Sequence, residues 1–487
     1  MSLRRLSLIC AFLVAVPVLR AAEPAPALTD DPRVASALEL AQAWLDAQRA
    51  YEQVPGVSAA IVHDQTVLWS GGFGLADVAS GRPAGPDTIY SICSISKLFT
   101  SVAVMQMRDA GKLRLDDPVR SRLPWFTMKP GGTDGTEITV EGLLTHASGI
   151  PRETDVPYWT GPAFAFPTRA EIVDRVARQT ALYPAETYFQ YSNLGMTLAG
   201  EIVSAVAGVP YADYVAKNIL APLKLASTTP EMPETERGRR LATGYSAMTR
   251  AGRRDPVAFF QGRGVAPAMG FASTAGDLAR FASWQFRLLG GGGNEVLRAA
   301  TLREMQRVHF VDPDFETMWG LGFAVARREK TTLVGHGGSC PGFRTQLTLQ
   351  PEEKVAAVVL TNASGIDTGA WSEQVLAIVA PALKAATKEP GKGKTPDPQL
   401  RKFAGTYSEA PWGGEIFVLP WEDGLAMVSF PSEHPMKDLV RLKKTGDLTF
   451  RRIRKDETLG EEIAFELGAD GRATRFRRHS NYSTRVN

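Results

Sequence analysis

The sequence is poor in the residues that build metal centres and disulfide frameworks. Its 487 residues include three cysteines, Cys10, Cys93 and Cys340, and six histidines. Three cysteines are too few for a scaffold of disulfides, and the histidines lack the spacing of zinc ligands. We therefore expect neither a metal site nor a bound cofactor.

An excess of one charge is also missing. The chain carries 55 Lys and Arg against 52 Asp and Glu, a formal net charge of +3. Nucleic-acid backbones select clustered basic side chains, and no such run occurs here, so we expect no nucleic-acid partner. The composition, with 44% hydrophobic and 22% charged residues, is that of a globular protein. The length allows about two to four domains.

Long apolar runs are absent except at the N-terminus. Residues 1–22 contain Arg4 and Arg5, then the apolar stretch 6–19, then small residues, which is the layout of a secretory signal peptide. The stretch contains Pro17 and is shorter than the roughly 20 residues that span a bilayer, so a permanent anchor is the weaker alternative. We predict a cleaved signal peptide, a periplasmic or secreted protein, and no stable membrane anchor.

Residues 32–386 combine strand and helix patterns. Strand patterns near both ends flank a mostly helical middle, which predicts a mixed α/β unit. The expected elements are a helix at 36–51, a hairpin at 56–73, a helix from 94 to a stop at Gly111, helices at 170–180, 194–207 and 275–289, strands at 323–327, 331–336, 344–350 and 354–362, and a helix at 372–386.

The last part of the chain has a different pattern. Residues 387–398 are rich in Pro, Gly and Lys and are typical of a linker. Residues 399–487 form short alternating stretches broken by Gly and Asp turns. This pattern predicts a small all-β domain of barrel-like form.

Ser94 and Lys97 form a Ser-x-x-Lys motif at the start of a predicted helix. Their spacing places both side chains on one face, so the lysine can contact the serine hydroxyl. A lysine whose pKa is lowered by burial can take the serine proton, and backbone N–H groups at the helix start favour a developing oxyanion. Taken alone, the motif is more typical of a capping serine followed by a solvated lysine.

Two further motifs change this interpretation. Tyr191 and Asn193 form a Tyr-x-Asn motif directly before a predicted helix, and His336-Gly337-Gly338 follows a strand pattern. The glycines of the triplet allow close approach of another backbone. Each motif alone is typical of a turn, but three motifs in this order, in matching contexts, indicate one active site.

With these motifs the chain resembles the serine β-lactamase and penicillin-binding-protein hydrolases. The resemblance is closest to the class C β-lactamase-like branch, which includes esterases, D-amino peptidases and D-Ala-D-Ala carboxypeptidases, and it covers about residues 32–386. It implies an antiparallel sheet flanked by helices, with an all-helical subdomain. Residues 399–487 resemble, less specifically, the lipocalin-like barrels appended to some of these hydrolases. Further matching segments are GKLRLDDPV at 111–119, LLTHASGIP at 143–151, GFASTAGDLARF at 270–281 and HGGSCPGF at 336–343.

The resemblance implies an acyl-enzyme mechanism. Ser94 would be the nucleophile, and Lys97 and Tyr191 would share proton transfer, with the identity of the first base left open. Asn193 would orient the substrate and the lysine. The oxyanion hole would consist of the backbone N–H groups of Ser94 and Ser339, and the triplet His336-Gly337-Gly338 would bind substrate.

One departure from the family bears on the substrate. Many members have Lys-Thr-Gly where this chain has His336-Gly337-Gly338, and a histidine is mostly neutral at pH 7, so carboxylate recognition is weaker. A second candidate triplet, Lys444-Thr445-Gly446, is interpreted as a hairpin turn of the C-terminal domain. His146 is interpreted as a loop histidine bonded to backbone, since the chain has no Gly-x-Ser-x-Gly elbow for it to serve.

The positions of Cys93 and Cys340 beside the motifs match those of a disulfide in some class A relatives. The resemblance therefore suggests a Cys93–Cys340 bond, and two buried thiols remain an equal alternative.

The sequence thus predicts a secreted serine hydrolase acting on a small-molecule or peptide substrate, including cell-wall-derived compounds. A broad esterase or amidase ranks first, a D-amino-acid peptidase second, and a β-lactamase or D-Ala-D-Ala carboxypeptidase third. One alternative of another class is a catalytically silent penicillin-binding or sensor protein. In a second alternative, the C-terminal barrel is a ligand-binding module with the main function.

Overall fold

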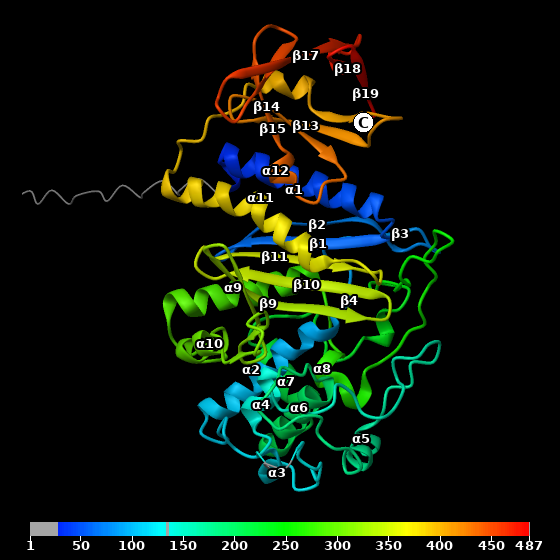
Figure 1. The fold of residues 1–487 in the computed structure, drawn as a ribbon, viewed down its shortest axis with the longest axis vertical. Helices are drawn as coiled ribbons and strands as arrows, with labels where there is room; N and C mark the ends of the chain where they lie inside the picture. Colours follow the sequence, from blue (N-terminus) through cyan, green and yellow to red (C-terminus); the bar gives the residue numbers. More distant parts are fainter. Residues whose placement is uncertain (1–27, 133–135, 487) are drawn as a thin grey trace, which may run out of the picture.

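The computed structural model describes residues 28–132 and 136–486. The predicted signal peptide, residues 1–22, and Cys10 lie outside the described residues. The described chain forms four layers, with a barrel at the top of Figure 1, then two helices, then a large sheet, then a helical body.

The large sheet is antiparallel and is built from strands near both ends of the α/β unit. Among the described residues it has nine strands in the order β3-β2-β1-β11-β10-β9-β8-β7-β6. The predicted hairpin at 56–73 is present, because β1 pairs with β2, and β1 also pairs with β11 from the far end of the unit. The strands are β1 (Gly56–His63), β2 (Thr66–Asp77), β3 (Arg82–Pro83), β6 (Phe310–Val311), β7 (Met318–Trp319), β8 (Ala324–Arg328), β9 (Thr331–Cys340), β10 (Phe343–Gln350) and β11 (Val355–Thr361).

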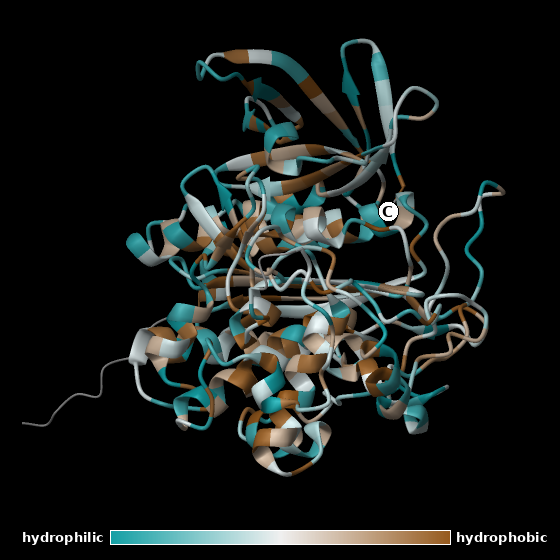
Figure 2. Ribbon diagram, turned by 60° about the horizontal axis from the view of Figure 1, so that its bottom comes forward, coloured by the Kyte–Doolittle hydropathy of each residue, from teal (hydrophilic) through white to brown (hydrophobic). Residues whose placement is uncertain are grey.

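Helices cover one face of this sheet and continue into an all-helical body. Alternate strand residues such as Leu347 and Val358 point into the same core as Phe99 and Phe281 from the helices. Figure 2 shows hydrophobic residues gathered in these helices below the sheet. The helices of this body are α2 (Ser96–Asp109), α3 (Val119–Arg122), α4 (Val140–Thr145), α5 (Arg169–Val176), α6 (Asn193–Ala207), α7 (Tyr211–Val215), α8 (Ala266–Met269), α9 (Ala275–Gly291) and α10 (Ala299–Met305).

Short helical turns and one small sheet join these elements. The two strands β4 and β5 pair beside the start of α2. Their bounds, with those of the turns, are β4 (Tyr90–Ser91), β5 (Ala272–Ser273), η1 (Leu28–Asp30), η2 (Cys93–Ile95), η3 (Ala216–Leu220), η4 (Glu234–Glu236), η5 (Arg263–Val265) and η6 (Pro398–Lys402).

Two long helices, α1 (Pro32–Tyr51) and α11 (Thr368–Lys388), cover the other face of the sheet. α1 begins with Asp31 as its N-cap and Pro32 at the first helical position, a combination that satisfies free N–H groups at a helix start. Trp44 and Trp371 meet edge to face between the helices, with ring centroids 6.3 Å apart. α11 extends two residues into the predicted linker, and its N-terminus reaches the candidate site described below.

The C-terminal residues form a closed antiparallel barrel. Eight strands among the described residues close in sequence order, and β12 pairs with β19 to complete the ring. The Lys444-Thr445-Gly446 segment begins at the last residue of β15 and continues into the turn before β16, where the Thr445 N–H donates to the Thr449 carbonyl over 3.0 Å. The barrel elements are β12 (Gly405–Ser408), β13 (Glu415–Trp421), β14 (Gly424–Phe430), α12 (Pro435–Asp438), β15 (Val440–Lys444), β16 (Thr449–Ile453), β17 (Leu459–Leu467), β18 (Ala473–Arg478) and β19 (Asn481–Arg485).

The barrel shares a core with the two long helices. Leu419, Val428 and Phe430 on the outside of the barrel belong to the same buried cluster as Trp44 and Trp371. The Trp44 indole N–H also donates to the Ser432 carbonyl over 2.8 Å. The barrel is therefore packed onto the α/β unit through apolar contacts.

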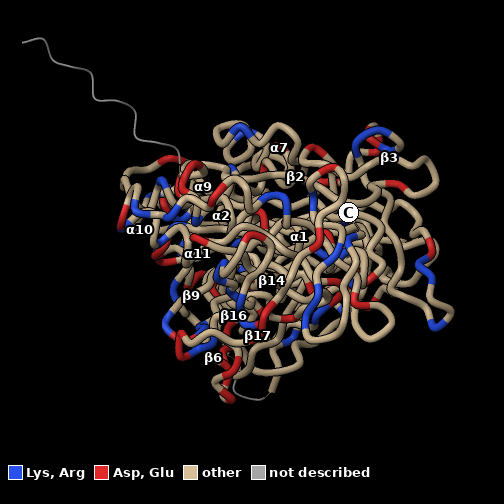
Figure 3. Tube along the Cα trace, turned by 90° about the horizontal axis from the view of Figure 1, so that it is seen from above, with Lys and Arg blue, Asp and Glu red and all other residues tan. Residues whose placement is uncertain are grey.

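Charge and membrane features are unremarkable in the described chain. Basic and acidic residues are intermixed in the view of Figure 3. Within the residues that the structure describes, no single helix has the length and hydropathy of a membrane span, although the bent pair formed by 193–207 and 211–220 meets that test by length and composition. The same residues place no three His, Cys, Asp or Glu side chains where they could hold a metal ion together.

Candidate active site

Ser94 lies on the 3-10 turn η2, which leads from β4 into α2. The regular helix therefore begins two residues later than predicted. Cys93 has a positive φ of 48°, a conformation that few non-glycine residues adopt. Ser94 within this turn and Lys97 in the first turn of α2 lie on the same helical face, as the three-residue spacing predicts.

The Lys97 side chain is fully buried and contacts three oxygen atoms. Its Nζ lies 3.0 Å from Ser94 Oγ, 2.7 Å from Asn193 Oδ1 and 2.8 Å from the Ala268 carbonyl oxygen. Burial lowers the pKa of Lys97 well below its ordinary value, nearby Glu153 opposes the shift, and Arg152 adds to it. A neutral Lys97 can donate its two N–H groups to the amide and carbonyl oxygens, which leaves its lone pair for the Ser94 proton.

Tyr191 faces Ser94 from the loop before α6. Burial raises the pKa of the Tyr191 phenol above its ordinary value, while a hydrogen bond with Ser94 and the charge of Arg152 act in the opposite direction. Lys97 Nζ and the Arg152 guanidinium each lie 4.8 Å from the Tyr191 ring centroid. At neutral pH Tyr191 is therefore a protonated phenol that can donate a proton.

Asn193 links the lysine to a carboxylate that sequence reasoning missed. Its Nδ2 donates to Glu153 Oε1 over 2.6 Å, while its Oδ1 accepts from Lys97. The Tyr158 hydroxyl also donates to Glu153. Glu153 follows the matching segment 143–151 by two residues, but only the fold brings it to Asn193.

His146 holds the loop that carries Tyr191. It is fully buried, ends α4 with a φ of 60°, and its Nδ1 accepts the Ser192 N–H over 3.2 Å. Its ring lies 4.3 Å from the Tyr191 ring, centroid to centroid. The interpretation of His146 as a backbone-bonded loop histidine agrees with this geometry.

The triplet on β9 lies beside these residues, but its three members differ in position. His336 is 4% exposed and packs against Tyr191 and Trp319, and burial lowers its pKa to about 3. Its ring does not line the cavity beside Ser94, whereas Gly337 and Gly338 do. A methyl group on Gly338 would overlap the Ile92 carbonyl and Thr345, so this glycine admits the chain's own backbone.

A cavity of about 340 Å³ opens above Ser94. The predicted residues Ser94, Tyr191 and Ser339 share it with two arginines, Arg152 and Arg344, that sequence reasoning missed. Isolated arginines carry no motif, so no sequence signal distinguishes them from surface residues. The rest of the lining is Gly337, Gly338, Thr345, Gln346, Ile366, Asp367, Thr368 and Gly369.

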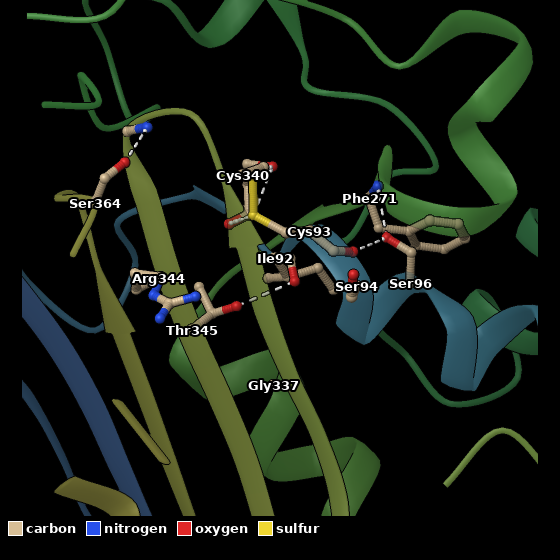
Figure 4. The surroundings of a disulfide bond; sticks show 12 residues. Ile92, Cys93, Ser94, Ser96, Phe271, Gly337, Cys340, Arg344, Thr345 and Ser364 are labelled. Atoms are coloured by element: carbon tan, nitrogen blue, oxygen red, sulfur yellow. Dashed lines mark hydrogen bonds between the residues drawn. A yellow bond between two sulfur atoms is a disulfide. The ribbon is translucent and has the colours of Figure 1, made fainter. Parts of the chain in front are cut away.

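A disulfide bond joins Cys93 to Cys340 beside Ser94. Figure 4 shows the two sulfurs linking η2, the turn that carries Ser94, to the end of β9, the strand that carries Ser339. In the same view Thr345 Oγ1 donates to the Ile92 carbonyl over 3.1 Å. These contacts tie the turn that carries Ser94 to the strand that would supply the second oxyanion donor.

Comparison with known proteins gives a consistent picture. The family model described as Beta-lactamase matches residues 41–378. Penicillin-binding protein 4 of Amycolatopsis lactamdurans is 28% identical over 339 residues, which cover 68% of this chain and 87% of that protein. The structure of the octameric penicillin-binding protein homologue from Pyrococcus abyssi aligns with a TM-score of 0.61 and 24% identity over 92% of this chain and 99% of that one. EstCE1, a hydrolase with promiscuous acyltransferase activity, aligns with a TM-score of 0.59 and 22% identity over 71% of this chain and 99% of its own.

Proposed function

The chain belongs to the beta-lactamase family, and from this membership and the site geometry we propose that it is a serine hydrolase acting through an acyl-enzyme on Ser94. The observation that carries the proposal is the contact of Ser94 Oγ with a fully buried Lys97 whose other two partners are carbonyl oxygens. A structural lysine would gain nothing from such burial, because removing an ammonium from water is costly.

The proposed reaction begins with transfer of the Ser94 hydroxyl proton to Lys97. Ser94 Oγ then attacks the substrate carbonyl carbon, and the backbone N–H groups of Ser94 and Ser339 stabilise the negative charge on its oxygen. Tyr191 gives its proton to the leaving group and regains one from Lys97. A water molecule then attacks the acyl carbon and releases the acid, which restores the Ser94 hydroxyl.

The uncharged triplet His336-Gly337-Gly338 favours an esterase or amidase. A histidine whose pKa is lowered to about 3 supplies no positive charge for a substrate carboxylate at neutral pH. An uncharged ester or amide needs no such charge. The second candidate is a D-amino-acid peptidase, because Arg152 and Arg344 line the cavity and could pair with a terminal carboxylate. A β-lactamase or D-Ala-D-Ala carboxypeptidase ranks third.

The first test compares wild type with Ser94→Ala on three substrates. These are a short-chain nitrophenyl ester, a D-aminoacyl nitroanilide and a chromogenic cephalosporin. We expect the ester to be turned over fastest, the activity to disappear in Ser94→Ala, and intact mass to show an acyl adduct on wild type only. Ser121→Ala, at an exposed serine on α3, is the matched control. No turnover and no adduct with any substrate would favour a silent binding protein.

We also propose that the protein is exported after cleavage of residues 1–22. The arginines followed by an apolar stretch support this proposal. N-terminal sequencing of the protein from a bacterial host should find it in the periplasm or medium without these residues. An intact N-terminus on membrane-bound protein would contradict it.

A further inference from the structure

The C-terminal barrel has a cavity at one end that the proposed hydrolase reaction does not use. The cavity has a volume of about 690 Å³ and lies between the turn that follows β12 and the turn that joins β18 to β19. A closed barrel of about eight strands is just wide enough to be filled by side chains or to hold one small ligand. In this barrel, side chains fill one end of the interior, and the cavity occupies the other end.

The filled end is closed by aromatic side chains. Phe403, Tyr407, Phe450 and Phe476 are fully buried and Phe465 is 2% exposed, all in one cluster. Aliphatic residues form the next layer and the floor of the cavity, namely Ile416, Met427, Val440 and Ile463. A ligand could therefore enter from one end only.

Toward the open end, the inward positions of the strands change from apolar to polar. Side chains alternate along a strand, so residues two apart face the same side. On β16 the inward position after the buried Phe450 is Arg452, two residues later. On β18 the inward position after the buried Phe476 is Arg478. The other polar residues at this level of the cavity are Glu409, Ser429, Glu461 and Asn481.

This polar layer has little net charge. Arg478 is paired with Glu409 over 2.8 Å, and Arg452 and Glu461 attract each other electrostatically. Asp438 also lines the cavity and accepts a hydrogen bond from the Ser432 hydroxyl. Across the described residues, the Arg452 guanidinium and the Asn481 amide donate to no other protein group. The layer thus offers donors and acceptors to a polar ligand but does not select for an ion.

Two aromatic side chains stand at the opening. Trp412 is 93% exposed and Tyr482 is 48% exposed, and both line the cavity. The exposed indole of Trp412 offers a flat apolar face that a ligand ring could cover, and covering it would remove apolar surface from water. The Arg475 guanidinium lies 4.2 Å from the Tyr482 ring centroid and holds that ring in place.

We propose that the open end of the barrel binds a neutral saccharide. The C–H face of a sugar ring would stack on Trp412, and its hydroxyl groups would exchange hydrogen bonds with Arg452, Glu461 and Asn481, which present both donors and acceptors. An anion would meet Glu409, Glu461 and Asp438, and a fatty acyl chain would leave the polar layer without partners. The balance of groups therefore favours an uncharged, hydroxyl-rich ligand.

The test is calorimetric titration of the full-length protein with three neutral disaccharides, maltose, cellobiose and di-N-acetylchitobiose. We expect at least one to bind with a Kd of about 1 mM or lower. Trp412→Ala and Arg452→Ala should each weaken that binding by about tenfold or more. Phe315→Ala, at an 80% exposed aromatic outside the barrel, and Lys443→Ala, at an outward-facing position of β15, should bind as wild type does.

Each other outcome would overturn the proposal. No heat with any of the three disaccharides would do so, as would binding that Trp412→Ala and Arg452→Ala leave unchanged. Binding of laurate in place of the sugars would assign the cavity to lipids. Circular dichroism of the barrel variants distinguishes a lost site from a lost fold. Turnover of the nitrophenyl ester is measured separately, so the result does not depend on the hydrolase proposal.

Discussion

The most informative single residue is Lys97, because its surroundings determine which group would take the Ser94 proton in the proposed reaction. Burial lowers the pKa of Lys97 and raises that of Tyr191, so at neutral pH the amine is the better base and the phenol the better acid. The sequence left this choice open. Sequence alone does not make it, because both pKa shifts arise from tertiary packing.

Lys97→Ala should therefore reduce kcat/KM by about 10²- to 10⁴-fold. In wild type, kcat/KM should rise with pH as Lys97 loses its proton, with a midpoint below the ordinary lysine pKa of about 10.4. Tyr191→Phe should lower kcat but keep this rise of kcat/KM with pH, which is the acid limb of the profile. A pH–rate profile with the ester substrate checks both expectations. An acid limb that persists in Lys97→Ala would assign it to another group.

His336 makes stability depend on pH. Its pKa is about 3 in the folded protein, and that of a histidine in an unfolded chain is about 6.5. Between these values the unfolded chain binds more protons, so the stabilisation is complete above about pH 6.5 and is lost as the pH falls, by about 1.4 kcal/mol per pH unit. His336→Gln should flatten this slope in urea unfolding measured from about pH 5 to 7. The exposed His434→Gln is the control, and an equal slope in wild type and His336→Gln would contradict the assignment.

Residue-level prediction from the sequence was good where chemistry is local. Ser94 and Lys97 lie one helical turn apart, so their contact follows from their spacing. Glu153 and Arg344 were not predicted, because they reach the site from separate loops and strands. His336 was predicted to bind substrate, and in the structure it lies behind Tyr191 instead of lining the cavity.

At the scale of elements, the site depends on the close approach of β9 to η2. Gly338→Ala would place a methyl group against the Ile92 backbone, which cannot move without shifting Ser94. We expect a loss of about 1–3 kcal/mol in unfolding free energy. A displacement of about 1 Å at Ser94 would also reduce kcat by about 100-fold.

Gly337→Ala is the matched control for stability. A methyl group there would meet Gln346 Oε1 at 2.7 Å, and this flexible amide can turn away. Urea unfolding and ester turnover are measured for both variants. Equal losses of stability would show that the close packing of Gly338 on Ile92 is not important.

The Cys93–Cys340 disulfide also joins η2 to β9. It joins residues separated by 247 positions, and closing a long loop restricts the unfolded chain. Replacing both Cys93 and Cys340 by alanine should lower the unfolding free energy by about 2–4 kcal/mol. In protein lacking residues 1–22, thiol titration after denaturation should find no free thiol without reductant and two with it. Two free thiols without reductant would contradict the bond.

At the scale of the whole molecule, the fold class followed from the alternation of strand and helix patterns. The small C-terminal β domain was also predicted, since short alternating strands with polar turns indicate a barrel. The packing of the barrel on α1 and α11 could not be predicted, because apolar residues such as Phe430 alternate along a strand whether they face a lumen or another domain.

This shared core predicts the effect of removing the barrel. Deletion of residues 399–487 would expose the faces of α1 and α11 that Val428 and Phe430 cover, including Trp44. The truncated protein should therefore unfold at a lower urea concentration and bind more of the hydrophobic dye ANS, because apolar surface exposed to water favours unfolding and association. Phe476→Ala in the full chain is the control, since this side chain fills the barrel's own core and leaves the interface covered. A truncated protein with an unchanged midpoint and no added dye binding would show that the interface does not stabilise the α/β unit. Acylation of Ser94 in the folded fraction would then establish whether the catalytic site needs the barrel at all.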